Sequence, residues 1–141
     1  MSSNEQLWTV RITDFAKSHY GKKFKKKYHR AWDITEEAII EQLRRVDSLD
    51  RESSHFAVVN GSLAGGFGKL EFAVAGSGKS PKGSGCRAIA WMDGSVRKVE
   101  VLLVYSKNEI GPPNETAKWQ QVVKREFPEY WRSVSGESGT M

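Results

Sequence analysis

The sequence has little of two things, cysteine and long apolar runs. Cys86 is the only cysteine in 141 residues, which excludes a disulfide framework, and no Cys/His cluster has the spacing of zinc ligands. The longest apolar run, Val101 to Tyr105, is far below the roughly 20 residues that a membrane span needs. The polar start lacks the layout of a signal peptide. We therefore expect a cytoplasmic protein without membrane contact, metal or cofactor.

Charge is plentiful and unevenly distributed. The 22 basic and 17 acidic residues give a formal net charge of +5. Seven of the basic residues fall between Lys17 and Arg30 with no acid among them, and the remaining 15 nearly balance the 17 acids. A dense basic run among aromatic residues is typical of proteins that bind a phosphate-rich polymer. The alternative is a helix face that is merely solvated.

Two helices are expected in the first half. Four aromatic residues recur at four-residue intervals in and just after the basic run, which favours one helix face packed in a core over a platform that stacks bases. They are Tyr20, Phe24, Tyr28 and Trp32. A second amphipathic helix is predicted from about Ile34 to Leu49, after a capping-box pair. The three histidines are scattered, and we expect each to be a surface residue: His19, His29 and His55.

Alternation of apolar and polar residues predicts two strands, and the Asp93-Gly94 pair between two β-like runs predicts two more, whereas the glycine-broken segment from His55 to Gly68 has no clear pattern. The strands are Trp8 to Ile12, Lys69 to Val74, Arg87 to Met92 and Val96 to Tyr105. A last helix should follow Asn114 as N-cap and stop at Pro128. The sequence thus predicts one α+β domain over residues 1–132, with a flexible tail over 133–141. Its small antiparallel sheet has about four strands, with two N-terminal helices and one C-terminal helix.

The pair Asp93-Gly94 predicts a hairpin with a two-residue turn. That register places Arg87 opposite Glu100. One face of the hairpin is then apolar and suits helices, whereas the other is mixed and bears Arg87, Lys98 and Glu100. We expect a ligand on the mixed face.

The segment Ala73 to Ser80 fits a loose phosphate-loop pattern after a predicted strand. Pro81 and several small residues follow, so we expect no helix to start there and reject a nucleotide-hydrolysing domain. Lys79 and Lys82 on this glycine-rich loop suit closure over a nucleic-acid backbone. A flexible loop whose lysines only improve solubility is the alternative.

The residues from Lys69 to Asn108 resemble the RelE/ParE superfamily of toxin components from toxin-antitoxin pairs. In that superfamily an arginine opens the penultimate strand, and the last strand ends in an aromatic-x-Lys element. The matching residues here are Arg87, Tyr105 and Lys107. The continuation GPPNETAKWQQVVKREF resembles the C-terminal helix of the HigB-like branch.

The resemblance implies a RelE-like fold and a ribosome-dependent, metal-independent mRNA endonuclease that a cognate antitoxin protein neutralises. Arg87, Tyr105 and Lys107 would then be catalytic, stabilising charge on phosphorus and moving protons. Nine lysines are candidates for RNA binding: Lys22, Lys23, Lys25, Lys26, Lys27, Lys69, Lys79, Lys82 and Lys98. Members often carry an arginine where Ala73 aligns. That departure keeps a non-catalytic alternative open, either a gyrase-directed ParE-like toxin or a module that binds nucleic acid or protein.

Overall fold

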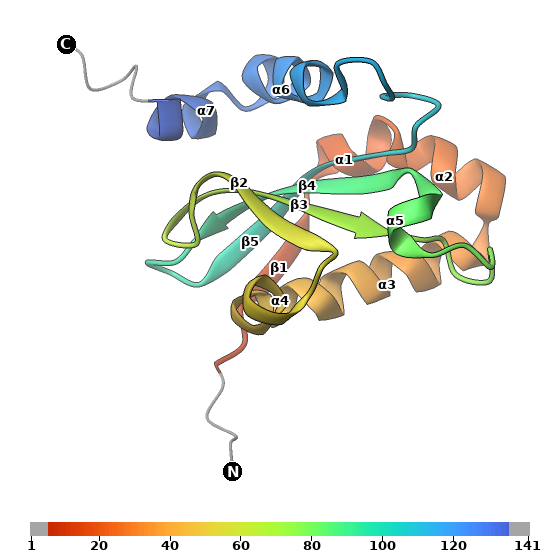
Figure 1. Ribbon diagram of the computed structural model, residues 1–141, viewed down its shortest axis with the longest axis horizontal. Helices are drawn as coiled ribbons and strands as arrows, with labels where there is room; N and C mark the ends of the chain where they lie inside the picture. Colours follow the sequence, from red (N-terminus) through yellow and green to blue (C-terminus); the bar gives the residue numbers. More distant parts are fainter. Residues whose placement is uncertain (1–5, 136–141) are drawn as a thin grey trace.

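The computed structural model describes residues 6–135, which form an α+β fold around one mixed sheet (Figure 1). The sheet has five strands in the order β1-β5-β4-β3-β2 within this range. They are β1 (Thr9–Ile12), β2 (Phe56–Ser62), β3 (Gly65–Phe72), β4 (Cys86–Asp93) and β5 (Lys98–Tyr105). β1 runs parallel to β5, and the other neighbours are antiparallel. The prediction of about four antiparallel strands is therefore corrected to five strands in a mixed sheet.

The additional strand is β2, which lies in the glycine-broken segment that showed no pattern. The chain pairs there because two glycines of β3 let other groups come close. A side chain at Gly66 would meet the Asn60 carbonyl oxygen, and one at Gly68 would meet the ring of Phe56. The sequence of this segment shows no alternation of apolar and polar residues, because the glycines carry no side chain.

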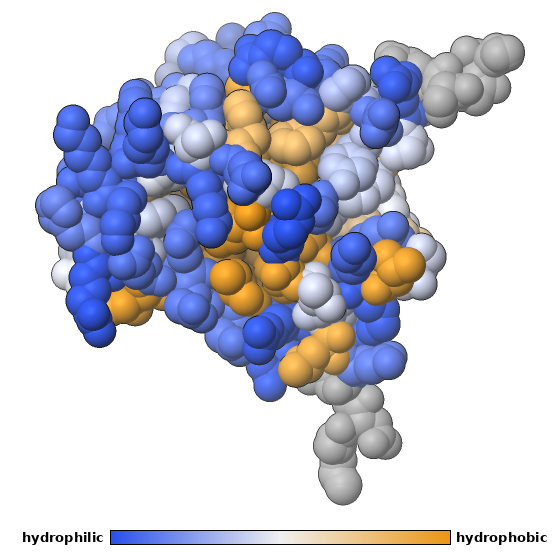
Figure 2. Space-filling view, turned by 180° about the vertical axis from the view of Figure 1, so that it is seen from behind, coloured by the Kyte–Doolittle hydropathy of each residue, from blue (hydrophilic) through white to orange (hydrophobic). Residues whose placement is uncertain are grey.

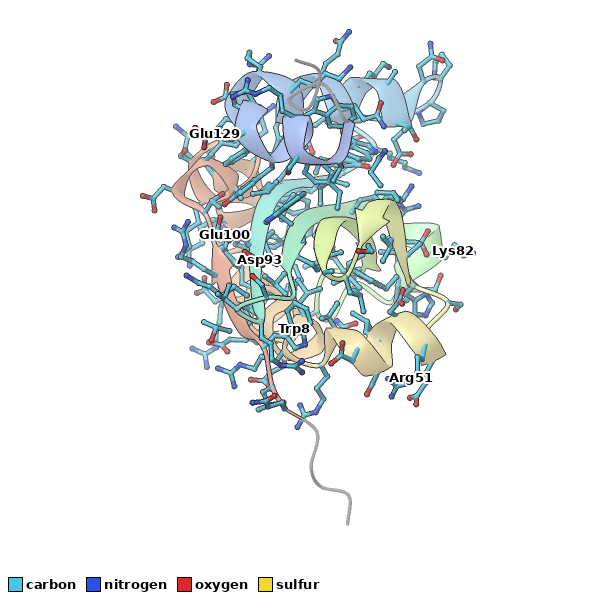
Figure 3. The ribbon with its side chains drawn as sticks, turned by 90° about the vertical axis from the view of Figure 1, so that its left-hand side faces the viewer. Trp8, Arg51, Lys82, Asp93, Glu100 and Glu129 are labelled. Carbon is cyan, nitrogen blue, oxygen red and sulfur yellow. The ribbon has the colours of Figure 1, made fainter. Side chains whose placement is uncertain are left out.

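Helices cover both faces of the sheet, giving three layers (Figures 1 and 3). Within residues 6–135 the helices are α1 (Asp14–Ser18), α2 (Gly21–Tyr28), α3 (Arg30–Arg44), α4 (Val46–Glu52), α5 (Pro81–Ser84), α6 (Glu115–Glu126) and α7 (Pro128–Ser135). We call the side packed against α2, α3 and α4 the lower face and the side packed against α6 and α7 the upper face. The arrangement differs from the predicted two N-terminal helices and one C-terminal helix.

Backbone breaks account for the larger number of helices. His29 adopts a φ of 54° between α2 and α3, and Arg45 separates α3 from α4. Pro128 starts α7 as well as ending α6, so residues 133–135 are helical where a tail was predicted, and 136–141 lie outside the described residues. The expectation of no helix after the glycine-rich loop is also wrong, since Ser80 caps one turn of helix at Pro81.

The aromatic stripe packs largely in the core, as the spacing predicted, although two helices carry it. Phe24 of α2 and Trp32 of α3 are buried on the lower face, with ring centroids 4.4 Å apart. Phe72 of β3 lies against both rings. This contact fixes α2 at the end of the sheet where β3 stops.

The hairpin between β4 and β5 exists, but its register differs from the predicted one. Asp93 pairs with Lys98, so four residues form the loop, and Arg97 lies at a φ of 52°. Arg97 leaves the strand because its guanidinium donates to Asp47 at 2.9 Å and lies over the ring of Trp8. The pairing of Arg87 with Glu100 is therefore wrong. A later register shift sets Arg87 opposite Tyr105.

The mixed face is the upper face, and helices cover much of it. Trp119 and Val123 of α6 are fully buried there. Tyr130 of α7 stacks on Trp91 with ring centroids 4.8 Å apart. Any ligand on this face must therefore bind at the end of the sheet that bears Arg87, away from the aromatic contacts of α7.

Candidate nucleic-acid interface

A pocket of about 130 Å³ opens at the end of the sheet where β3 stops and β4 begins. Its lysines come from three separate segments: Lys23 and Lys27 of α2, Lys79 of the glycine-rich loop, and Lys107 just after β5. We call this site the lysine pocket. All four lysine side chains are exposed, whereas Phe24, Val74 and Cys86 form a buried apolar floor.

The local sequence explains why these lysines meet. Lys23 and Lys27 are four residues apart, which places them on one side of α2 beside the anchoring Phe24. Gly85 has a φ of 76°, and a side chain there would come within 3.0 Å of the Lys107 Cδ. Glycine at this position lets the Lys107 stem pass close to the start of β4.

The pocket carries excess positive charge. Glu109 is the one carboxylate among its lining residues, and it accepts hydrogen bonds from the Ser106 amide and hydroxyl at 2.8 Å. Lys25, which binds Asp33, is the only lysine in residues 6–135 that has a carboxylate within 4 Å. Burial raises the pKa of the Cys86 thiol, so this floor residue is neutral near pH 7. The pocket thus offers four ammonium groups to an anion.

A second cluster lies on the upper face at the same end of the sheet. The Glu71 amide donates to the His55 carbonyl at 2.7 Å, Glu71 pairs with Arg87, and Arg87 pairs with Tyr105. These residues form one row across the neighbouring strands, and we call it the polar row. Side chains directly opposite each other in a sheet point to the same face, so the row is set by the register.

Acidic side chains surround Arg87 in this row. Its Nη2 lies 3.5 Å from Glu71 Oε2, and its Nε lies 4.0 Å from Glu115 Oε2. The guanidinium also donates to the Cys86 carbonyl at 3.0 Å. The Tyr105 hydroxyl donates to Glu115 at 2.6 Å, and burial, together with this carboxylate, raises the pKa of Tyr105. Tyr105 is fully buried, which argues against a direct part in proton transfer.

Two polar atoms of the row have no hydrogen-bond partner. His55 Nδ1 and Glu71 Oε1 are both buried and lie 3.8 Å apart. Buried polar atoms are normally hydrogen-bonded, so such a pair requires an explanation. His55 is half-buried here, not the plain surface residue that its isolation in the sequence predicted. Only the pairing of β2 with β3 reveals its neighbours, and no local sequence signal marks it.

The other predicted site residues lie apart from the lysine pocket lining. Lys22 and Lys26 are exposed on α2, and Lys25 is paired with Asp33. Lys69 lies on β3 opposite Ile89, and exposed Lys98 lies on β5 beside the hairpin loop. Lys82 extends from α5 (Figure 3), and its carbonyl oxygen accepts from Arg87 at 3.4 Å.

Glu100 belongs to a different contact from the one predicted. Arg11 binds it at 2.6 Å, and the Tyr130 hydroxyl donates to it at 2.5 Å. Glu100 therefore joins β1, β5 and α7. Glu100 is therefore not the ion-pair partner of Arg87.

The lysine pocket and the polar row lie back to back. Cys86 lines the pocket and Arg87 belongs to the row, and successive residues of a strand point to opposite faces. Helix α5 contacts both sites, because Ser84 lines the pocket and the Pro81 and Lys82 carbonyls accept from Arg87. Seen from behind, the side that carries α2 is mostly hydrophilic, and a larger apolar patch lies in the centre of the view (Figure 2).

No group of three or more His, Cys, Asp or Glu side chains in residues 6–135 is placed to hold a metal ion. No helix in that range is both long and apolar enough to cross a membrane. No protein-family model, curated protein or solved structure matches this chain. The resemblance to the RelE/ParE superfamily therefore stays a prediction.

Proposed function

We propose that this protein binds RNA and holds the RNA backbone in the lysine pocket. The observation that carries the proposal is the convergence of four lysines from three separate segments on one pocket. Four amines gathered beside a single carboxylate favour a phosphate, because each bound phosphate replaces small counterions and the released ions favour binding. The pocket volume of about 130 Å³ is large enough for a single phosphate group, because a protein cavity of about 150 Å³ can hold benzene.

A tyrosine at the pocket supports RNA over a free anion. Lys27 lies 5.2 Å from the ring centroid of Tyr28, which also lines the pocket and is only partly buried. A base that leaves its stack can rest on such a ring while the lysine holds its phosphate. Unpaired bases are accessible in single-stranded RNA, which makes a single strand the favoured partner.

The resemblance extends this proposal to a toxin-like mRNA endonuclease that acts with the ribosome in the cytoplasm, needs no metal and is neutralised by an antitoxin. Lys107 of the resembling residues lies in the lysine pocket, and Arg87 lies just behind it. The second candidate is a non-catalytic RNA binder. The polar row supports this candidate. Carboxylates lie close to Arg87 on two sides, and the buried Tyr105 hydroxyl donates a hydrogen bond to one of them.

Paired substitutions on α2 test the binding proposal. Changing Lys23 and Lys27 to glutamine should weaken binding to single-stranded RNA. The slope of log affinity against log salt should fall by up to about two, since each lost phosphate contact lowers it by roughly one. A fluorescence-anisotropy titration over a range of salt concentrations measures both quantities.

Lys22 and Lys26 provide the matched control. They have the same spacing on the same helix, but they do not line the pocket. The variant with both changed to glutamine has the same net charge as the first variant and should retain most of the affinity. Equal losses in the two variants would show that α2 acts only through diffuse charge, and the pocket proposal would then fail.

A further inference from the structure

We propose that His55 and Glu71 form an acid-base pair, in which Glu71 positions His55 as the base, and that this pair cleaves RNA at the polar row together with Arg87. This inference rests on the proposed endonuclease function and assigns it catalytic groups other than Tyr105 and Lys107. The inference starts from the polar row, which brings together three chemically different groups: His55 just before β2, Glu71 of β3 and Arg87 of β4.

The geometry orients the histidine ring. His55 Nδ1 is buried and faces Glu71 Oε1, whereas the side chain as a whole is 38% exposed. The exposed part of the ring therefore lies away from Nδ1 and includes the side that bears Nε2. If Nδ1 carries the proton, it points at the carboxylate, and Nε2 is left as a base that substrate can reach. Catalytic hydrogen bonds are often long before substrate binds, so the 3.8 Å separation suits a pair that tightens on binding.

Arg87 supplies the positive charge that this chemistry requires. Its guanidinium lies 3.5 Å from the other oxygen of the same Glu71 carboxylate, so one acid joins the base to the cation. Attack on a phosphodiester adds negative charge to the phosphoryl oxygens in the transition state. A fixed guanidinium beside them stabilises that charge more than it stabilises the starting diester.

The proposed step is transfer of the phosphoryl group within one RNA strand. His55 Nε2 takes the proton of a ribose 2′-hydroxyl, and the 2′-oxygen forms a bond to the adjacent phosphorus. The bond from phosphorus to the 5′-oxygen breaks, and its electron pair leaves with that oxygen, which takes a proton from water. The imidazolium then returns its proton to the resulting hydroxide. The products are a 2′,3′-cyclic phosphate and a 5′-hydroxyl end, and the step needs no oxidant or other reactant.

The unpartnered atoms favour this role over a purely structural one. A structural histidine-glutamate contact would close to hydrogen-bond distance, yet both facing atoms are left without a partner. Glu71 then acts as a positioning residue, because it works through His55 and Arg87. Lys69 lies two residues before Glu71 on the same face of β3 and is only partly buried. Its ammonium group can therefore hold the RNA backbone near the polar row.

The test compares the purified full chain with His55→Ala and His55→Gln variants on ribosome-bound mRNA. His55→Ala should slow cleavage at least about a hundredfold while RNA affinity stays unchanged, and added imidazole should restore part of the rate. The 5′ fragments of the wild-type reaction should end in a 2′,3′-cyclic phosphate. His55→Gln keeps the polar contact to Glu71 without a base, so it should also be slow and should fold even where alanine does not.

His29→Asn is the control, because His29 is exposed and lies outside the polar row. This variant should cleave at the wild-type rate. Cleavage by both His55 variants at the wild-type rate would overturn the acid-base pair and leave the endonuclease proposal standing. A wild-type chain that binds RNA but never cuts it would overturn both the endonuclease and the pair, and would leave RNA binding.

Discussion

Gly68 of β3 shows how one missing side chain shapes the lower face. A Cβ built there would lie 2.5 Å from the Phe56 Cζ and 3.1 Å from the Met92 Cε. Phe56 is buried, so its ring cannot swing out into solvent to make room. The glycine therefore allows the Phe56 ring of β2 to pack against β3 on the lower face.

Gly68→Ala should lower the free energy of unfolding by about 1 to 3 kcal/mol, because overpacking displaces Phe56 and Met92. Gly65→Ala is the matched control on the same strand, since nothing lies within 4 Å of its added Cβ. Urea unfolding of both variants measures the difference. Equal stability would mean that the Phe56 ring adjusts freely.

At the residue scale, the sequence named candidate site residues where a short motif or a basic run marked them, and it missed those that only strand pairing brings together. Lys107 is the lysine of the aromatic-x-Lys element and lies in the lysine pocket. His55 and Glu71 are 16 positions apart, and the strand that joins them was hidden by glycines. Glu100 was assigned to Arg87 because a two-residue turn was assumed, whereas the contacts of Arg97 lengthen the loop.

At the scale of elements, Tyr130 joins α7 to the sheet by one hydrogen bond and one stacked ring pair, and Trp131 of α7 also lies against Phe67 of β3. Tyr130 stacks on Trp91, and its hydroxyl donates to Glu100. Burial and the Glu100 carboxylate raise the pKa of Tyr130 to about 12. Burial alone would raise the pKa of Glu100, but hydrogen bonds from Tyr130 and Arg11 outweigh it and hold that pKa below 4.5.

Tyr130→Phe should lower the free energy of unfolding by about 1 kcal/mol at pH 7, the usual contribution of one hydrogen bond. The raised pKa of Tyr130 means that its contribution is complete below its ordinary pKa of 10 and is lost as pH rises to about 12. The gap between wild type and variant should therefore shrink over that interval in urea titrations.

Tyr28→Phe is the control for this effect. Its hydroxyl makes no hydrogen bond that involves α7, and the side chain lies on α2 at the other end of the molecule. Its stability should change little and should follow the wild-type pH dependence. A Tyr130→Phe variant with the same alkaline loss of stability as wild type would show that the Glu100 contact does not secure α7.

Helices were predicted correctly in kind and wrongly in extent. The apolar spacing located α3 and α6, but it continued through Arg45, where the backbone turns to a φ of −111° and a ψ of 43°. Asn114 precedes α6 as predicted, yet it adopts a φ of 64° and its side chain caps nothing. Periodicity reports which side is apolar. It does not report where tertiary contacts bend the chain.

At the scale of the whole molecule, the two candidate sites occupy opposite faces of one sheet end. The basic run of the sequence contributes Lys23 and Lys27 to the lower face, and the resemblance contributes Arg87 to the upper face. If the lysine pocket holds RNA as proposed, the strand has to pass around α5 to reach the polar row. Lys79 and Lys82 lie along that path, before and within α5.

Which molecule the protein acts on is best tested in growing bacteria. If the chain is a toxin-like mRNA endonuclease, inducing it without its antitoxin should stop growth, and translated messages should be cut at the codon in the ribosomal A site. Mapping the new RNA ends across the transcriptome measures this. His55→Ala, induced to the same level, should leave transcripts intact, because RNA binding without the base cannot break the chain.

The alternatives give different patterns in the same cells. A gyrase-directed toxin stops growth with intact transcripts and with gyrase complexes on DNA. A non-catalytic RNA binder leaves both transcripts and DNA intact, and its effect on growth should be the same with His55→Ala but weaker when Lys23 and Lys27 are changed to glutamine. The lysine pocket thus matters to both RNA-directed functions and the polar row to one of them, so the two sets of variants identify the function as well as the site.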